Sequence, residues 1–121
     1  MTQHASLTLD RWRRFPPEQQ LLMVANEFHR LFHYLALAQP DGLRGGYERV
    51  LRLTDLTVQA AERRGLRREL LRWRDLVAAL YVAPESDRTE LERVERALLL
   101  LFPAGAAQLR ALYGTAVPRS S

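Results

Sequence analysis

The chain has 121 residues, of which 47% are hydrophobic and 26% are charged, and its formal net charge is +4. These values are ordinary for a globular domain and exclude an intrinsically disordered chain. The absence of cysteine excludes a disulfide framework and a zinc–thiolate site. All 18 basic residues are arginines, which favour bidentate contacts with carboxylates or phosphates.

The uninterrupted apolar runs, such as the one from Ala97 to Phe102, are far shorter than the roughly 20 residues that a membrane-spanning helix needs. The N-terminal residues lack a charged leader followed by an apolar core, so no secretory signal is expected. We therefore predict a cytoplasmic protein without membrane contact. We expect a single domain over residues 8–114, a loose N-terminus over 1–7 and a disordered tail over 115–121.

The first ordered element is expected to be a short helical turn that Thr8 caps and in which Asp10 suits the helix dipole. Trp12 and Phe15 follow and are free to fold back onto the rest of the domain. Pro17 fits the first turn of a longer helix. The N-terminal segment is therefore predicted to pack against the domain rather than to extend from it.

The main helix is predicted over residues 17–38, where apolar residues recur at three- and four-residue steps. Met23, Tyr34 and Leu37 fall outside this apolar stripe, interleaved with polar residues. A helix that is apolar on more than one side is normally covered on more than one side, by its own chain or by a partner. This helix is therefore expected to be enclosed and to contribute to a protein interface.

A turn is predicted over residues 39–42, with Gly42 supplying a positive φ. The second helix is expected over 43–64, although the glycines at 45 and 46 make its first turn uncertain. Its apolar residues cover most of its circumference, which predicts that it is largely buried. Gly65 suits the left-handed position that follows a helix C-terminus.

The third helix is predicted over residues 66–82, and Trp73 lies on its apolar stripe. Asp87 has the spacing to Glu90 of a capping box and begins a fourth helix over 88–102. A short fifth helix is expected over 104–113. No segment alternates like a strand, and the connections are short. The sequence therefore predicts an all-α, up-and-down antiparallel helical bundle of four main helices plus a short C-terminal helix.

His29 and His33 are the best candidates for a metal site, because residues four apart share one face of a helix. The pair lacks the neighbouring glutamate of a zincin motif, and no third ligand is evident. The alternative is that both histidines pack at the border of the apolar stripe with wet tips. We expect the latter and predict no metal site and no cofactor.

A cluster of arginines in the second hairpin is a candidate contact for an anion or nucleic acid. Two of its members lie in the first turn of a helix, where cations are disfavoured. The alternative is a solvated face with local ion pairs. The cluster consists of Arg63, Arg64, Arg67, Arg68, Arg72 and Arg74.

No nucleotide-binding loop, nucleophile elbow or paired Glu-x-x-His motif is present, so no enzymatic activity is expected. The surplus apolar surface instead predicts a helical interaction module that forms a homodimer or binds another protein. The alternative function is a regulatory nucleic-acid-binding module that uses the arginine cluster. The predicted interface consists of Met23, Tyr34, Leu37, Leu53, Leu56 and Leu100.

Overall fold

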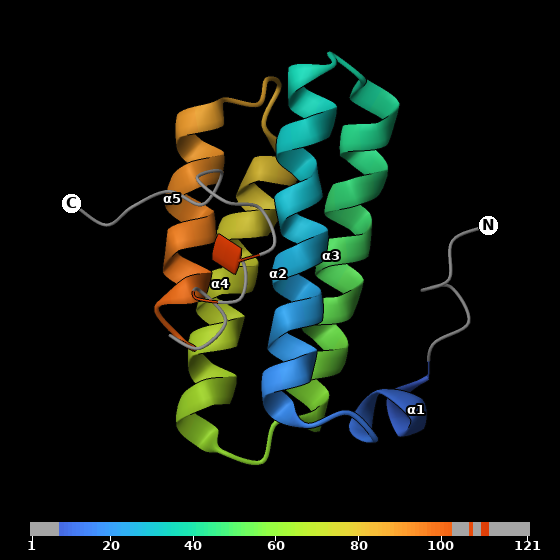
Figure 1. Cartoon of the computed structure of the whole chain (residues 1–121), viewed down its shortest axis with the longest axis vertical. Helices are drawn as coiled ribbons and strands as arrows, with labels where there is room; N and C mark the ends of the chain where they lie inside the picture. The colour runs from blue at the N-terminus through green and yellow to red at the C-terminus, as the bar shows by residue number, and fades with distance from the viewer. Residues whose placement is uncertain (1–7, 103–106, 108–109, 112–121) are drawn as a thin grey trace.

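The computed structural model describes residues 8–102, 107, 110 and 111, and this part of the chain contains helices and no strand. Four longer helices run alternately up and down, and each packs against the next, with the last returning to the first (Figure 1). The predicted all-α antiparallel bundle is confirmed. The helices are α1 (Leu9–Arg13), α2 (Pro17–Ala36), α3 (Pro40–Ala60), α4 (Arg64–Val82) and α5 (Arg88–Leu99).

The short helix α1 lies across the end of the bundle at which α2 begins (Figure 1). As predicted, Thr8 caps it by accepting a hydrogen bond from the backbone N–H of Arg11. Trp12 is fully buried, and its indole N–H donates to the hydroxyl of Thr57 on α3 at 3.1 Å. The side chain of Gln20 donates to the Trp12 carbonyl at 3.1 Å. These contacts fix α1 against both α2 and α3.

Helix α2 begins at Pro17, as predicted, and packs against both α3 and α5. It ends at Ala36, two residues before the predicted end, and the positive φ of 51° occurs at Ala38 rather than at Gly42. The chain therefore reverses direction immediately after α2. Helix α3 already begins at Pro40, so the turn predicted over 39–42 is shorter than expected.

The glycines near the start of α3 lie inside the helix and do not delay it. They allow α3 to approach α2 closely, since a Cβ on Gly42 would lie 2.6 Å from the Tyr34 ring. The backbone at Gly46 is buried against Leu31 in the same way. The cost of glycine within a helix is therefore offset by close packing at this position.

The connection between α3 and α4 differs from the prediction. Helix α3 ends at Ala60, the following Ala61 is extended, and α4 begins at Arg64. Gly65 therefore lies in the first turn of α4 and does not terminate α3. The earlier break leaves Ala61 buried, and the guanidinium group of Arg67 donates to its carbonyl oxygen.

Helices α4 and α5 complete the ring. Trp73 is buried, as predicted, and its indole N–H donates to the carbonyl of Val94 on α5 at 2.7 Å. Asp87 caps α5 by accepting from the backbone N–H of Thr89 at 3.1 Å. Helix α5 ends at Leu99, earlier than predicted. The predicted helix over 104–113 lies mostly outside the described residues, and the predicted ends 1–7 and 115–121 lie wholly outside them.

None of the helices in the described part of the chain is both long enough and apolar enough to cross a lipid bilayer.

Candidate functional site

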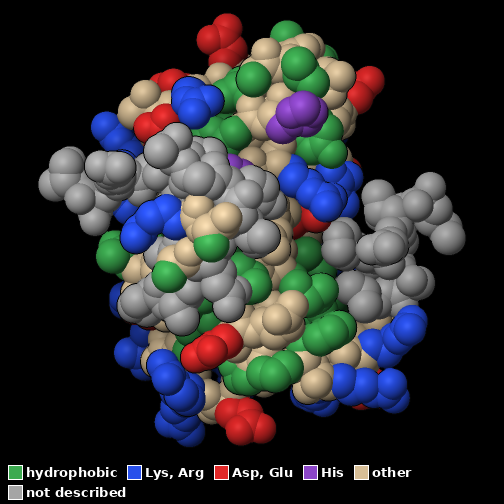
Figure 2. All heavy atoms as spheres, viewed as in Figure 1, with side chains coloured by type: hydrophobic (Ala, Val, Ile, Leu, Met, Phe, Trp, Pro, Cys, Tyr) green, Lys and Arg blue, Asp and Glu red, His purple; other side chains and the backbone are tan. Residues whose placement is uncertain are grey.

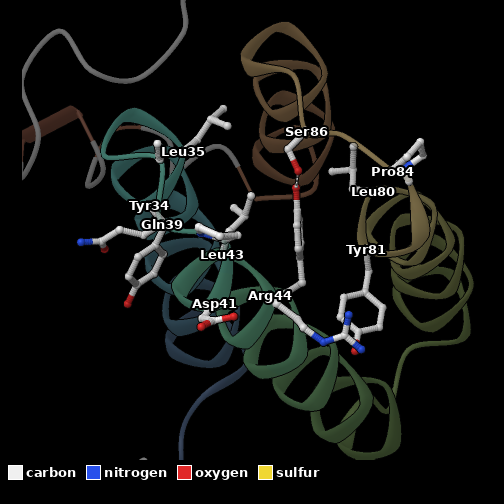
Figure 3. A pocket seen from close by; sticks show the side chains of 14 residues that line it. Tyr34, Leu35, Gln39, Asp41, Leu43, Arg44, Leu80, Tyr81, Pro84 and Ser86 are labelled. Atoms are coloured by element: carbon white, nitrogen blue, oxygen red, sulfur yellow. Dashed lines mark hydrogen bonds between the residues drawn. The ribbon is translucent and has the colours of Figure 1, made fainter.

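A cleft of about 550 Å³ opens at the end of the bundle where α3 and α5 begin. Its walls come from the α2–α3 turn, the first turns of α3, the end of α4 and the α4–α5 connection. Figure 3 shows the side chains of α2 and α4 on opposite sides, with the α3 side chains between them. The volume is within the range of binding sites for small ligands or inserted side chains. The apolar and aromatic lining consists of Tyr34, Leu35, Leu43, Tyr47, Leu80, Tyr81, Pro40 and Pro84.

Three polar contacts hold this cleft in shape. The hydroxyls of Tyr47 and Ser86 lie 2.9 Å apart and join α3 to the α4–α5 connection (Figure 3). Tyr81 donates to the carboxylate of Glu48 at 2.7 Å, and the guanidinium group of Arg44 lies 5.1 Å from the centre of the Tyr81 ring. Burial raises the pKa of Tyr47, and the hydrogen bond to Glu48 raises the pKa of Tyr81. Both phenols are therefore neutral at physiological pH.

The end of the bundle that carries the cleft has an excess of carboxylates, and we call it the acidic end. Its six acidic residues outnumber four arginines in the same region, Arg44, Arg49, Arg88 and Arg93. Arg44, Arg88 and Arg93 pair with Glu48, Glu92 and Glu90, and Arg49 pairs with Glu27. Such an excess attracts cationic groups to the mouth of the cleft. The acidic residues are Asp41, Glu48, Glu85, Asp87, Glu90 and Glu92.

Two exposed apolar residues belong to the chain segments that form the cleft. Leu37, with 52% of its surface exposed, lies in the chain between the lining residues Leu35 and Ala38. Val82 is 77% exposed and follows the lining residue Tyr81. Exposed apolar side chains next to an aromatic cleft in the chain are candidates for a docking surface.

The residues predicted to form a protein interface are therefore separated by the fold. Tyr34 lines the cleft, Leu37 is exposed in the chain segment next to it, and Met23 is partly buried against the core. The inclusion of Leu53 and Leu56 was wrong, because the neighbouring helices bury both side chains. The second apolar side of α3, on which both residues lie, is therefore covered by the protein's own helices. Leu100 is 73% exposed, but it lies past the end of α5, away from the cleft.

The two candidate metal-ligating histidines have different surroundings. Nδ1 of His29 lies 2.6 Å from a carboxylate oxygen of Glu95 on α5, and this carboxylate is fully buried. His33 is exposed on the outer face of α2, next to Tyr34. Among residues 8–102, 107, 110 and 111, no three His, Cys, Asp or Glu side chains come together to hold a metal ion. His29 and Glu95 thus link α2 to α5.

The predicted arginine cluster is also divided. Arg74 forms an ion pair with Asp55 that raises the pKa of Arg74, and Arg72 pairs with Glu69 at 2.9 Å, the contact expected for a solvated face. Arg63, Arg64 and Arg68 are exposed, and within the described chain their guanidinium groups form no ion pair.

The fold adds three exposed arginines that the sequence did not indicate. Arg11, Arg13 and Arg14 belong to α1 and its cap, which lie at the same end of the bundle as the start of α4. Arg13 and Arg63 line one cavity of about 630 Å³, although they are far apart in the sequence. Figure 2 shows blue side chains on both sides of the lower edge of the molecule with red ones between them, and side chains of both colours near its top.

Two buried carboxylates were also missed. Glu27 is almost completely buried and accepts a hydrogen bond from Arg49 on α3. Burial alone would lower the pKa of Arg49, but the hydrogen bond and charge of Glu27 outweigh it and raise the pKa. Glu95 is the other, and one of its oxygens has no hydrogen-bond partner within the described chain. Such buried carboxylates are recognised by a hydrogen-bonding partner on another helix. The sequence does not show which helices are neighbours.

No protein-family model, no curated protein and no solved structure matches this chain. The geometry and the charge of the two bundle ends are therefore the basis on which a function is assigned.

Proposed function

We propose that the protein is a non-enzymatic helical module that binds a short segment of a partner protein in the cleft at its acidic end. The observation that supports this function is the apolar, aromatic-walled cleft of about 550 Å³ between the α2–α3 turn and the α4–α5 connection. Clefts of this kind accept one or two large side chains of a partner, which then contribute most of the binding energy.

The composition of the cleft defines the chemistry of the partner segment. The leucine, proline and tyrosine side chains of the lining suit a leucine or an aromatic residue. The surrounding carboxylates suit arginine or lysine next to that residue, and Asp41 lines the cleft itself. A cationic neighbour would also compete with Arg44 for the face of Tyr81. The expected partner is therefore a basic segment with one large apolar residue.

The cleft has pre-formed walls, which favours binding without a large ordering cost. The Tyr47–Ser86 contact fixes the α4–α5 connection, and close packing on Gly42 fixes the Tyr34 ring. The hydroxyls of the cleft already bond to one another, to Glu48 or to Arg49, which suits recognition rather than nucleophilic catalysis.

A selection from a display library of random peptides tests this function. We expect the selected peptides to combine Leu, Phe or Trp with Arg or Lys, and to perturb the NMR methyl signals of Leu35, Leu43 and Leu80. Leu43→Asp should weaken binding by about ten-fold or more, because it places a charge in the apolar wall. Leu71→Asp on the outer face of α4 is the control and should bind normally.

The proposal is wrong if peptides bind Leu43→Asp and the parent protein equally well while both remain folded by circular dichroism. Sedimentation of the protein without peptide measures self-association separately. A dimer that Leu43→Asp dissociates and Leu71→Asp preserves would identify a second copy as the partner, in agreement with the predicted homodimer.

A further inference from the structure

At the opposite end of the bundle, the structure points to a second binding surface, and we infer that it binds the phosphate backbone of double-stranded nucleic acid. We call this surface the basic end. It combines α1 with the α3–α4 connection and the first turns of α4, and it is separate from the cleft of the proposed function. Its arginines are Arg11, Arg13, Arg14, Arg63, Arg64, Arg67 and Arg68.

The surface is continuous, because the fold brings two distant segments of the chain together. Arg13 from α1 and Arg63 from the α3–α4 connection line the same cavity, together with the carboxylates Glu18 and Glu62. The position of α1 is fixed by the buried Trp12 side chain, which bonds to Thr57, and by the Gln20 side chain, which bonds to the backbone of α1 and of the residues after it. The arginines of α1 are therefore held beside those of α4 without a ligand.

The charge of the basic end is largely uncompensated. Its unpaired carboxylates are Asp10, Glu18 and Glu62, whereas the guanidinium groups of six of its seven arginines form no ion pair or hydrogen bond within the described chain. The seventh, Arg67, donates to the backbone carbonyl of Ala61 and forms no ion pair within the described chain. Like charges held this close repel one another, and an anion that binds among them relieves the repulsion.

The arrangement around α4 adds to this preference. Arg64, Arg67 and Arg68 lie in the first turns of α4, where the helix dipole disfavours cations, and no side chain caps this helix. A phosphate at this position would interact favourably with both the guanidinium groups and the dipole. The exposed arginines thus lie where they cost folding stability and favour anion binding.

The kind of polyanion follows from what surrounds the arginines. Single-stranded nucleic acid is usually bound by exposed aromatic side chains that stack on bases. In the described part of the basic end, Trp12 is buried and Phe15 is partly buried with its ring packed against Trp12. Guanidinium groups without stacking platforms instead suit contacts to a duplex backbone, which carry little sequence specificity. The acidic end, on the far side of the bundle, would face away from the duplex.

Fluorescence anisotropy with a labelled DNA duplex of mixed sequence tests the inference over a range of KCl concentrations. We expect binding at low salt that weakens linearly on a log–log plot. The triple variant Arg13→Gln/Arg63→Gln/Arg68→Gln should lose about ten-fold or more in affinity, and its slope should fall by roughly two to three, since each lost phosphate contact contributes about 0.9.

A matched control removes the same charge from the other end. Arg44→Gln/Arg88→Gln/Arg93→Gln replaces three exposed arginines of the acidic end and should change the affinity by less than about two-fold, because these residues face away from the duplex. Circular dichroism shows whether each variant is folded. If a triple variant is unfolded, its three single variants replace it in the same titration.

Four results would overturn the inference. The parent protein could fail to bind the duplex at low salt, or the two triple variants could weaken binding equally, which would show a general charge effect. If the protein bound poly-glutamate as tightly as the duplex at the same concentration of negative charge, the expected ligand of the basic end would be an acidic protein instead of nucleic acid. Loss of duplex binding by Leu43→Asp, the cleft variant, would show that the two surfaces are not independent.

Discussion

Gly46 of α3 lies against Leu31 of α2 so closely that a Cβ at Gly46 would be only 2.6 Å from Leu31 Cδ2. Both residues are buried, and Leu31 is completely enclosed. The absence of a side chain at this one position therefore sets the distance between the two helices that pack most extensively in the bundle.

We expect Gly46→Ala to destabilise the protein by about 1–3 kcal/mol, because overpacking in the α2–α3 interface exceeds the roughly 1 kcal/mol gained in helix propensity. Gly65→Ala is the control, because its Cβ would meet nothing within 4 Å. It should stabilise the protein by about 0.5–1 kcal/mol. Urea denaturation measures both changes. If Gly46→Ala stabilised the protein, the α2–α3 interface would have room for a Cβ that its geometry does not provide.

The His29–Glu95 contact predicts a strongly non-additive double-mutant cycle. His29→Leu should cost about 3–5 kcal/mol, because it leaves the fully buried Glu95 carboxylate without its partner. His29→Leu/Glu95→Leu should recover most of this loss, since two apolar side chains then meet between α2 and α5. Chemical denaturation of the parent, both single variants and the double variant measures the coupling. Additive changes would contradict the predicted interaction.

The free energy of unfolding should fall at alkaline pH because tyrosine side chains lose their protons. The folded-state pKa values of Tyr47 and Tyr81 are raised, so their contribution is complete below the unfolded value of about 10 and is lost as the pH rises above it. The chain has no lysine, so no amino side chain titrates in this range. Thermal unfolding between pH 8 and 12, together with absorbance of the phenolate, measures the effect.

Tyr47→Phe separates this titration from the packing of the ring. It should cost about 0.5–1.5 kcal/mol at neutral pH, because the hydrogen bond to Ser86 is lost. It should also reduce the decline in stability above pH 10, because one of the two shifted phenols is removed. If the free energy of unfolding of this variant fell as steeply above pH 10 as that of the parent protein, titratable groups other than Tyr47 would cause the fall.

The positive φ of 51° at Ala38 predicts a stabilising substitution. Ala38→Gly should raise the free energy of unfolding by about 1 kcal/mol, because glycine adopts a left-handed conformation without steric cost. Ala36→Gly, in the last turn of α2, is the control and should lower it by about 0.5–1 kcal/mol. Equal effects at both positions would indicate that the turn after α2 is not strained.

Most of the fold could be predicted from the spacing of apolar residues, since that spacing identifies helices and their buried faces. The buried position of Trp73 followed from the same pattern, whereas Trp12 was expected only to be free to fold back onto the domain. The helix ends were harder to predict where a glycine could either lie within a helix or belong to the turn next to it. Gly42 and Gly65 have the sequence context of turn residues, but close packing and the early end of α3 place both inside helices.

The candidate sites were harder to predict, because they depend on which helices are neighbours. Arg72 and Arg74 are adjacent to the other arginines of the hairpin, but each is occupied by a carboxylate. Arg13 joins the same surface only because α1 folds back across the end of the bundle. The cleft combines Tyr34 with Tyr81, which belong to helices that do not follow one another in the chain. Periodicity within one helix carries no information about such combinations.

The contacts of α5 have a consequence for the synthesis of the chain. Helix α5 packs against both α2 and α4, so it closes the ring only after the first 87 residues have been made. Until then, His29 of α2 and Trp73 of α4, which bond to Glu95 and Val94 of α5 in the finished protein, lack these partners. A nascent chain that pauses before Arg88 is therefore expected to be a chaperone substrate, and its folding is expected to complete in one cooperative step when α5 leaves the ribosome.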